Sequence, residues 1–223
     1  MMDIRYILTA LFLCILMGAC QEAPQADAAS VTTAQAVAPT EGERLRLDTA
    51  HSQVEWIGTK PTGKHHGRFK FSSGTLYLSK DTVSGGHFVI NMQSLENTDL
   101  LSDTSMKNKL ESELKGAQFL DVNKFPEATF DITGIEPCHP GNGDGLIMKD
   151  ATHMVKGNLT IRQITKNICF PARIDLTAKR VIADANFNMD RTLWGMNYRT
   201  DKSMQDKLIN ATVNISLHIV AKR

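Results

Sequence analysis

The chain has 223 residues, of which 42% are hydrophobic, and its 25 Lys and Arg against 24 Asp and Glu leave a formal net charge of +1. This composition is ordinary for a globular protein of one large domain or two small ones. No basic stripe or acidic tail is present, so nucleic acid is excluded as an expected partner.

The chain begins with a segment typical of secretion. Arg5 precedes an apolar run from Ile7 to Met17, which is too short to span a membrane and ends in "LMGAC". That ending resembles the lipobox of bacterial lipoproteins, whose cysteine is lipidated and becomes the new N-terminus. We therefore predict a signal peptide at residues 1–19, lipidation at Cys20, and a membrane-anchored lipoprotein in the cell envelope, facing the periplasm or the exterior. The alternative is an ordinary signal peptide with a chance cysteine.

Residues 21–43 contain no aromatic side chain and no apolar periodicity. Such a composition is typical of a flexible linker. Residues 20–43 are accordingly predicted to be a tether with a reach of roughly 25 to 30 Å as a random coil. The folded domain is expected at residues 44–223.

Alternation of apolar and polar side chains, which marks a β-strand with one buried face, recurs through that domain. In chain order it covers residues 52–58, 67–79, 86–95, 128–135, 155–161, 168–174, 180–189 and 209–222. The alternation changes phase near Gly74, which predicts a β-bulge there.

One helix is predicted between the third and fourth strands. Met106, Leu110 and Leu114 recur every four residues, Asp103 or Ser105 is placed to cap the start, and Gly116 is placed to end it. The apolar stripe predicts a face that packs against the sheet. A helix in a long barrel connection could instead cover one end and gate access.

The prediction is therefore an all-β fold with one or two short helices. Eight antiparallel strands form either a sandwich or a closed barrel, and a barrel of eight is about the smallest that can hold a small ligand. Large and small inward residues alternate, which also suits a solid core. The positions that we predict to line an interior and contact any ligand there are Val54, Trp56, Phe69, Phe71, Leu76, Phe88, Ile90, Met92, Phe130, Ile132, Gly157, Leu159, Ile161, Phe170, Ala185, Phe187, Val213 and Ile215.

Five ordered motifs resemble the YceI family of bacterial secreted proteins. They are "LDTAHSQVEWIGTK", "GKHHGRFKFSSGTL", "FVINMQSL", "FLDVNKFPEATFDITGI" and "KGNLTIRQITK", and the resemblance extends over nearly all of residues 45–223. It implies an eight-stranded, lipocalin-like antiparallel β-barrel whose hydrophobic interior binds a long polyisoprenoid lipid. It implies a binding protein rather than an enzyme, and no cofactor.

Two positions depart from the family pattern. Gln163 stands where the family usually has glycine in the turn after "LTIR", so this turn cannot rely on the free positive φ of glycine. Leu193 and Trp194 replace the acid and the aromatic residue of "R-x-D-F-G". A polar contact to a ligand head group near Leu193 is therefore not expected.

Two clusters of polar residues suggest a catalytic triad or a metal site, but their spacing argues against both. Asp48, His51 and Ser52 are close in sequence, but catalytic triads are assembled from separate segments, so local hydrogen bonds at a strand start are the preferred interpretation. His65 and His66 are adjacent and therefore face opposite sides of a strand, which argues against a shared metal ion. One of these histidines is expected to form a hydrogen bond at the mouth of the barrel.

Cys138 and Cys169 are predicted not to form a disulfide. Cys138 follows the fourth strand and Cys169 begins the sixth, so a meander would place them near opposite ends of the barrel. A disulfide needs Cα atoms within about 7 Å of each other.

The leading hypothesis is thus a carrier of a long apolar lipid, a polyisoprenoid or an isoprenoid quinone. The alternatives are a structural barrel with a filled interior, a lipid-modifying enzyme, and an outer-membrane barrel whose apolar face meets lipid. Few aromatic residues for two girdles, with two Trp and three Tyr, argue against the last. The sequence leaves the oligomeric state open.

Overall fold

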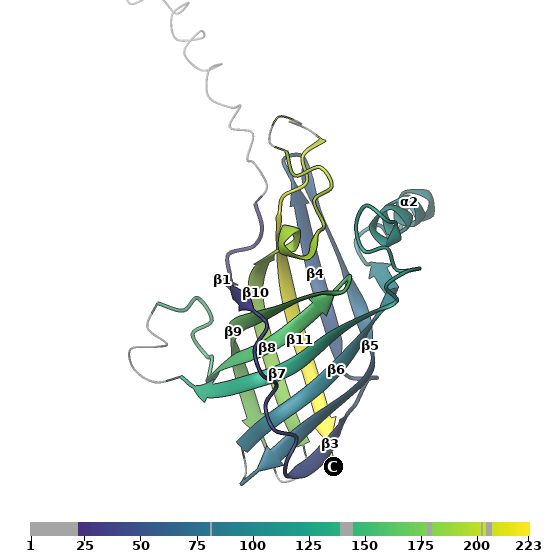
Figure 1. Ribbon diagram of the computed structural model, residues 1–223. Helices are drawn as coiled ribbons and strands as arrows, with labels where there is room; N and C mark the ends of the chain where they lie inside the picture. The colour runs from purple at the N-terminus through teal and green to yellow at the C-terminus, as the bar shows by residue number, and fades with distance from the viewer. Residues whose placement is uncertain (1–21, 81, 139–144, 178–179, 202, 204–206) are drawn as a thin grey trace, which may run out of the picture.

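The strands of the computed structural model form one sheet that rolls into a barrel (Figure 1). The structure describes residues 22–80, 82–138, 145–177, 180–201, 203 and 207–223. Its elements in chain order are β1 (Asp27–Ala28), β2 (Ser30–Thr33), β3 (Glu43–Leu47), β4 (Gln53–Lys60), β5 (Gly63–Ser79), β6 (Thr82–Asn97), α2 (Thr104–Lys115), β7 (Glu127–Pro137), β8 (His153–Ile161), β9 (Ile164–Leu176), β10 (Arg180–Asp190), the 3-10 helix η1 (Arg191–Trp194) and β11 (Thr212–Lys222).

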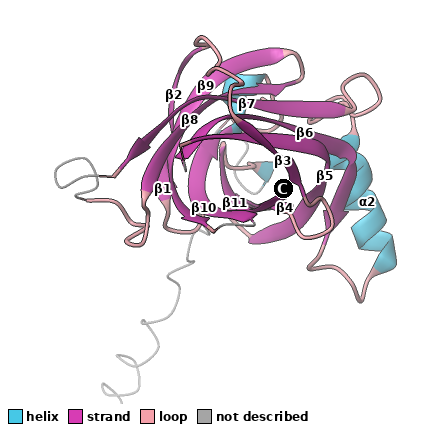
Figure 2. Cartoon of the chain, turned by 90° about the horizontal axis from the view of Figure 1, so that it is seen from below, coloured by secondary structure: helices cyan, strands magenta, loops and turns pink. Residues whose placement is uncertain are grey.

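The barrel confirms the predicted fold class. From β5 to β11 each strand pairs antiparallel with the next, and β3 and β4 close the ring by pairing with both β5 and β11. Because β3 and β4 occupy successive parts of one position, the ring has eight positions. Viewed from below, the strands enclose a closed ring with α2 outside it (Figure 2). The sequence pattern did not predict β3.

Strands β5 to β8 form a continuous wall. β5 has 17 residues and β6 has 16, and their register shifts between Arg68 and Lys70, between Phe71 and Ser73, and between Tyr77 and Leu78. The second shift lies beside Gly74, where the change of phase predicted a bulge. Bulges bend long strands, which lets them follow the curve of a barrel.

Strands β9 and β10 pair only briefly, from Leu176 with Val181 to Arg173 with Asp184. The carbonyl of Ala172 accepts a hydrogen bond from Thr152. Its neighbour Pro171 therefore turns its backbone toward β10, where it has no N–H to donate. The two strands separate beyond this point, leaving a gap that we call the seam.

The N-terminal strap, residues 24–38, fills the seam and then crosses the outside of the barrel to β3 (Figure 1). β1 pairs with β10 at Phe187 and Asn188, and β2 pairs with β9 from Cys169 to Lys166. The prediction of a flexible tether over residues 20–43 was therefore wrong for this segment. Its residues bury little apolar surface alone, but they complete the backbone hydrogen bonds of two exposed strand edges.

Outward-facing asparagines hold the strap. The backbone N–H of Gln35 donates to Oδ1 of Asn158 (3.0 Å), whose Nδ2 donates back to the Gln35 carbonyl (2.8 Å). Nδ2 of Asn188 donates to the carbonyl of Pro24 (2.9 Å). Asn158 and its cross-strand partner Asn167 are buried although they face outward. These two asparagines are buried because the strap covers the outer face of the sheet there, and the strap bonds to one of them.

Helix α2 begins and ends as its sequence predicts. The Asp103 side chain accepts a hydrogen bond from the Met106 N–H (2.9 Å), and the Gly116 N–H donates to the Glu113 carbonyl. No residue of α2 is buried, however. The apolar stripe, expected to pack against the sheet, does so only in part: Leu110 and Leu114 are half-buried and Met106 is exposed, because the helix lies over a hollow described below.

The residues that follow β10 close one end of the barrel interior, where Trp194 and Met196 pack against the core. Arg191 is 4% exposed and donates to the carbonyls of Met196, Tyr198 (2.9 Å), Ile209 (3.0 Å) and Asn210 (3.1 Å). Burial lowers the pKa of its guanidinium from the usual value. A single side chain thus organises this covering segment.

Two local predictions have instructive outcomes. Cys138 and Cys169 are both free thiols, as predicted. The prediction that they lie at opposite ends of the barrel was wrong. The backbone N–H of Cys138 donates to the Thr152 carbonyl, just before β8, and Cys169 pairs with Lys156 of the same strand. Gln163 does adopt a positive φ of 63°, although it is not a glycine.

Candidate functional site

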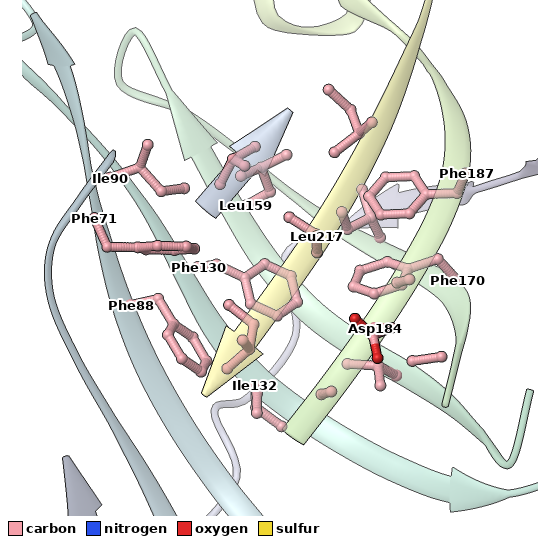
Figure 3. A pocket seen from close by; sticks show the side chains of 18 of the residues that line it. Phe71, Phe88, Ile90, Phe130, Ile132, Leu159, Phe170, Asp184, Phe187 and Leu217 are labelled. Atoms are coloured by element: carbon pink, nitrogen blue, oxygen red, sulfur yellow. The ribbon is translucent and has the colours of Figure 1, made fainter. Parts of the chain in front are cut away.

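The barrel encloses an apolar space of about 170 Å³, the interior cavity. Side chains from opposite walls point toward one another across it (Figure 3). The lining residues are Val54, Phe69, Phe71, Leu76, Val83, Phe88, Ile90, Met92, Ala128, Phe130, Ile132, Ile135, Val155, Leu159, Ile161, Ile168, Phe170, Ala172, Ile174, Val181, Ala183, Asp184, Ala185, Phe187, Met189, Ile215, Leu217 and Ile219.

The period of two explains most of this lining. All the residues that the sequence placed inside line the cavity except Trp56, Gly157 and Val213. Alternate residues of a strand face the same side of a sheet, so the strand pattern fixed the inward face. That a bound ligand contacts these side chains stays a prediction.

Local features explain why Gly157 and Trp56 do not line the interior cavity, and Val213 lies at a strand start. A Cβ on Gly157 would lie 2.1 Å from Cζ of Phe130, so the Phe130 ring already occupies that place. Trp56 lies outside the interior cavity and lines a second pocket under α2. Val213 stands at the start of β11, opposite Gly58 of β4.

The predicted set omitted thirteen lining residues. Most of them, such as Ala128, Ile168 and Leu217, continue the inward faces of the predicted strands, but two apolar residues do not. The register of β7 shifts between Ile132 and Gly134, which turns Ile135 inward. Val83 lies near the start of β6, ahead of the segment that showed alternation. The glycine in "DITGI" was the available signal for the first, because an isolated glycine in a strand suggests a bulge.

Aromatic rings form the middle of the cavity wall. Phe170 stacks on Phe187 with ring centroids 4.2 Å apart, and Phe130 lies 5.9 Å from Phe170. On the facing side Phe71 and Phe88 are 6.1 Å apart. These flat faces offer contacts to an alkyl or prenyl chain through dispersion and burial, without fixing its orientation by hydrogen bonds.

Asp184 is the ionisable residue in the lining. Its carboxylate lies at the edge of the group of side chains in Figure 3 and accepts hydrogen bonds from Arg173 (2.9 Å) and His218 (2.6 Å). Arg173 also contacts Asp150 and Asp175 on the outside of the barrel. The charge of Asp184 is therefore compensated from outside, and the cavity wall remains apolar.

The residues that suggested catalysis lie elsewhere and are otherwise engaged. His51 bonds Asp48 through Nδ1 (2.9 Å), and the pKa of the Asp48 carboxyl is lowered by hydrogen bonds from Lys222 and His51. Ser52 is buried, and its Oγ accepts from the Val220 N–H (2.9 Å) rather than facing His51. These contacts match local hydrogen bonding at a strand start.

The paired histidines also bond separate partners. Nδ1 of His65 lies 2.8 Å from Asp99, whereas Nδ1 of His66 lies 2.9 Å from Thr98. Within the described residues, no group of three or more His, Cys, Asp or Glu side chains is arranged to hold a metal ion. The hydrogen bond expected from one of these histidines is therefore present for both.

The size of the cavity limits what it holds in this conformation. Pockets for drug-sized ligands span about 300–1,000 Å³, whereas an apolar cavity of about 150 Å³ stays dry and admits a benzene-sized molecule. The interior cavity of about 170 Å³ is close to the smaller case. Its wall, apolar apart from Asp184, favours an apolar occupant over water.

The orientation of the apolar faces opposes the outer-membrane alternative. The apolar residues of β8 and β9 face the cavity, whereas Lys156, Asn158 and Asn167 face outward. A lipid-embedded barrel needs the reverse arrangement.

Across the described part of the chain, no helix combines the length and apolar character needed to span a bilayer.

Comparison with known proteins gives a consistent picture. The YceI-like domain model matches residues 45–221. A stretch of 61 residues is 38% identical to UPF0312 proteins of Yersinia pestis and Yersinia pseudotuberculosis, and covers 27% of this chain and 26% of the length of those relatives.

Two solved structures share the fold. Burkholderia cenocepacia BcnA superposes with a TM-score of 0.57 at 20% identity, over 78% of this chain and 98% of that protein. A polyisoprenoid-binding domain from Saccharophagus degradans, implicated in plant cell wall breakdown, superposes with a TM-score of 0.56 at 14% identity, over 80% and 97% of the two chains.

Proposed function

The chain belongs to the YceI-like domain family, and we propose that it is a carrier for a long apolar lipid, a polyisoprenoid or an isoprenoid quinone, held inside the barrel. The observation that carries this proposal is the interior cavity, whose wall is apolar apart from the externally compensated Asp184. The polyisoprenoid-binding domain of the same fold supports the choice of ligand class.

Burial of apolar surface drives binding of such a ligand. Each Å² of apolar surface removed from water contributes about 25 cal/mol. A lipid chain longer than the present cavity must displace side chains, and the residues that can turn aside are those facing the space, such as Met92 and Met189. Methionine adapts readily because its side chain is unbranched and flexible.

We propose a carrier rather than an enzyme. The described residues of the lining include no nucleophile, and their carboxylate, that of Asp184, is already bonded to Arg173 and His218. A general acid or base needs to reach the reacting group within hydrogen-bonding distance. Lipid binding through apolar contacts needs neither.

We also propose that Cys20 anchors the protein to a membrane of the cell envelope. Cys20 lies outside the described residues, but the strap that follows is bound to the barrel from Pro24 onward. Four residues span at most about 14 Å, so the anchor holds the seam close to the membrane surface rather than on a long tether. Cys20→Ala should release the protein or leave an unprocessed precursor, whereas unchanged membrane fractionation and mature size would contradict the anchor.

The carrier proposal is tested by filling the cavity. Ala185 is buried and lines the cavity, so Ala185→Phe adds a ring to the space that the lipid would occupy. Ile182 lies on the same strand at a position of opposite parity and is absent from the lining, so Ile182→Phe is the matched control. Both delipidated variants are compared with the wild type for uptake of a long-chain isoprenoid quinone and for thermal unfolding.

We expect Ala185→Phe to lose uptake with little change in stability, and Ile182→Phe to retain uptake. A cavity accepts volume that a filled core cannot, and overpacking a filled core costs about 1–3 kcal/mol. Failure of the wild type to take up the quinone, together with no lipid in an organic extract analysed by mass spectrometry, would return the chain to the class of structural barrels.

A further inference from the structure

A second pocket lies at one end of the barrel, between α2 and the strand ends beside it. This α2 pocket has a volume of about 260 Å³ and shares no lining residue with the interior cavity. Figure 1 shows α2 standing beside the end of β6. The proposed function does not account for this space.

One wall of the α2 pocket is the apolar stripe of the helix. Met106, Leu110 and Leu114 all line it, and none of them is buried. An amphipathic helix normally buries its apolar face against a partner. Here that face covers an open hollow, which leaves room for an occupant with an apolar portion.

The opposite wall contains a hydrogen-bond donor without a partner. Trp56 is 7% exposed and lines the pocket, and its indole Nε1 has no hydrogen-bond partner within the described part of the chain. Trp194, by contrast, donates from Nε1 to the carbonyl of Leu159 (3.0 Å). A buried N–H without an acceptor is costly and is rare in native structures. Trp56 therefore points to an acceptor that the chain itself does not provide.

The α2 pocket also carries positive charge. Lys60, Lys109 and Lys207 line it, and none of the three forms an ion pair with another described residue. Arg199 also lines the pocket, and its guanidinium nitrogen lies 3.9 Å from the carboxylate of Glu113, another lining residue. Among the described residues that line the pocket, four Lys and Arg side chains face one carboxylate, so the occupant that complements this charge is negative.

The α2 pocket and the interior cavity are adjacent along one strand. Val54 lines the interior cavity, and Trp56, which follows on the same face of β4, lines the α2 pocket. Trp56 also pairs across the sheet with Ile215, another residue of the cavity wall. One molecule with an apolar chain and a polar end could contact both spaces.

We propose that the α2 pocket binds the acidic head group of the lipid carried by the barrel. The head group is an oxyanion, such as a phosphate or a carboxylate, that accepts a hydrogen bond from Trp56 and is attracted by Lys60, Lys109 and Lys207. Charge-assisted hydrogen bonds are stronger than neutral ones, so the pocket selects acidic over neutral lipids of equal chain length. This inference rests on the proposed carrier function and specifies its ligand.

The test compares two probes of the same chain, farnesyl phosphate and farnesol, by isothermal titration of the delipidated protein. We expect the wild type to bind farnesyl phosphate at least tenfold more tightly. Trp56→Phe and Lys109→Gln should each reduce that preference to threefold or less. Lys115→Gln is the matched control, because Lys115 lies on the same helix but does not line the pocket, and it should keep the wild-type preference.

The outcomes separate this inference from the carrier function. Equal affinity of the wild type for both probes would overturn the head-group site and leave the carrier intact. Inorganic phosphate binding as tightly as farnesyl phosphate would assign the pocket to a free anion and also overturn the inference. If neither prenyl probe binds, the carrier function fails and the head-group site fails with it. Lys109→Gln is a surface change, so the test does not depend on the folding of Trp56→Phe.

Discussion

The continuous wall of β5 to β8 and the seam between β9 and β10 close the same barrel in different ways. In the wall, β5 pairs with β6 and β7 with β8 along most of their length, and β6 joins β7 by a shorter ladder from His87 to Asn91. β8 and β9 keep a regular ladder from His153 to Ile161. At the seam, direct pairing ends at Arg173 and Asp184, and the strap completes the sheet.

This difference shows how a sheet can be completed by a segment with little hydrophobic character. The wall is held by side chains packed on an apolar interior and by local hairpins. The seam is held by backbone hydrogen bonds and by asparagine side chains, because Pro171 leaves no N–H for β10. The wall should therefore respond to changes in volume, and the seam to the loss of polar partners.

Removal of the strap should cause the largest loss of stability, because the strap completes the seam. Deleting residues 22–38 removes β1, β2 and the bonds to Asn158 and Asn188, a loss on the order of 3–5 kcal/mol and about 10 °C in Tm. Thermal unfolding followed by circular dichroism measures it. A Gly-Ser segment of the same length keeps the backbone donors and acceptors but lacks the packing of Ala29 and Val31 and has a larger backbone entropy, so it should restore only part of the stability. An unchanged Tm after deletion would show that the seam closes without the strap.

A single polar contact at the seam should have the next largest effect. Asn158→Ala removes both hydrogen bonds to Gln35 and one of the two acceptors of the Asn167 side chain, and the loss of these three bonds costs about 2 kcal/mol. Urea unfolding gives the free energy of unfolding. Asn123→Ala, at an exposed position, is the control and should change it by less than about 0.5 kcal/mol. Equal effects of the two changes would contradict the role of Asn158 as a clamp.

A change of volume should test the wall. Gly157→Ala places a methyl group where Phe130 already lies, so we expect a loss of about 1 kcal/mol, the low end for overpacking, because the ring can move into the interior cavity. Gly134→Ala is the matched control, since its Cβ would meet only the end of the Lys156 side chain at 4.0 Å. Destabilisation of more than about 3 kcal/mol would indicate a filled interior with no space for the displaced ring.

The smallest expected effect is that of acid on the free energy of unfolding, through Asp99, which follows the end of β6 in the wall. Burial raises the pKa of the Asp99 carboxyl, but hydrogen bonds from the His66 N–H, from His65 and from Asn97 outweigh it and hold that pKa below its usual value. The resulting stability is present above the unfolded pKa of about 4 and is lost as the pH falls through the lower folded value. In Asp99→Asn, the free energy of unfolding should fall less between pH 5 and pH 2 than in the wild type. An identical fall would exclude Asp99 as a source of the acid sensitivity.

Particular residues show where prediction from sequence succeeded at the candidate site. Phe69, Phe71, Phe88, Phe130 and Phe170 were placed in the interior because alternate residues of a strand share one face, and all of them line the cavity. Ile135 was missed because a register shift in β7 broke the period. Trp56 was placed in the interior by parity alone, yet it lines the α2 pocket, because parity gives a face and not a height along the barrel.

The sequence by itself determined the strands β4 to β11, most of their inward faces and the helix limits at Asp103 and Gly116, because each depends on neighbours within a few residues. Only the tertiary structure decided the fate of residues 24–38 and of the α2 stripe. The strap has no apolar period, and its partners Asn158 and Asn188 are more than a hundred residues away in the chain. The stripe on α2 has the pattern of a packed face, but whether a surface meets it depends on where the strands end in space.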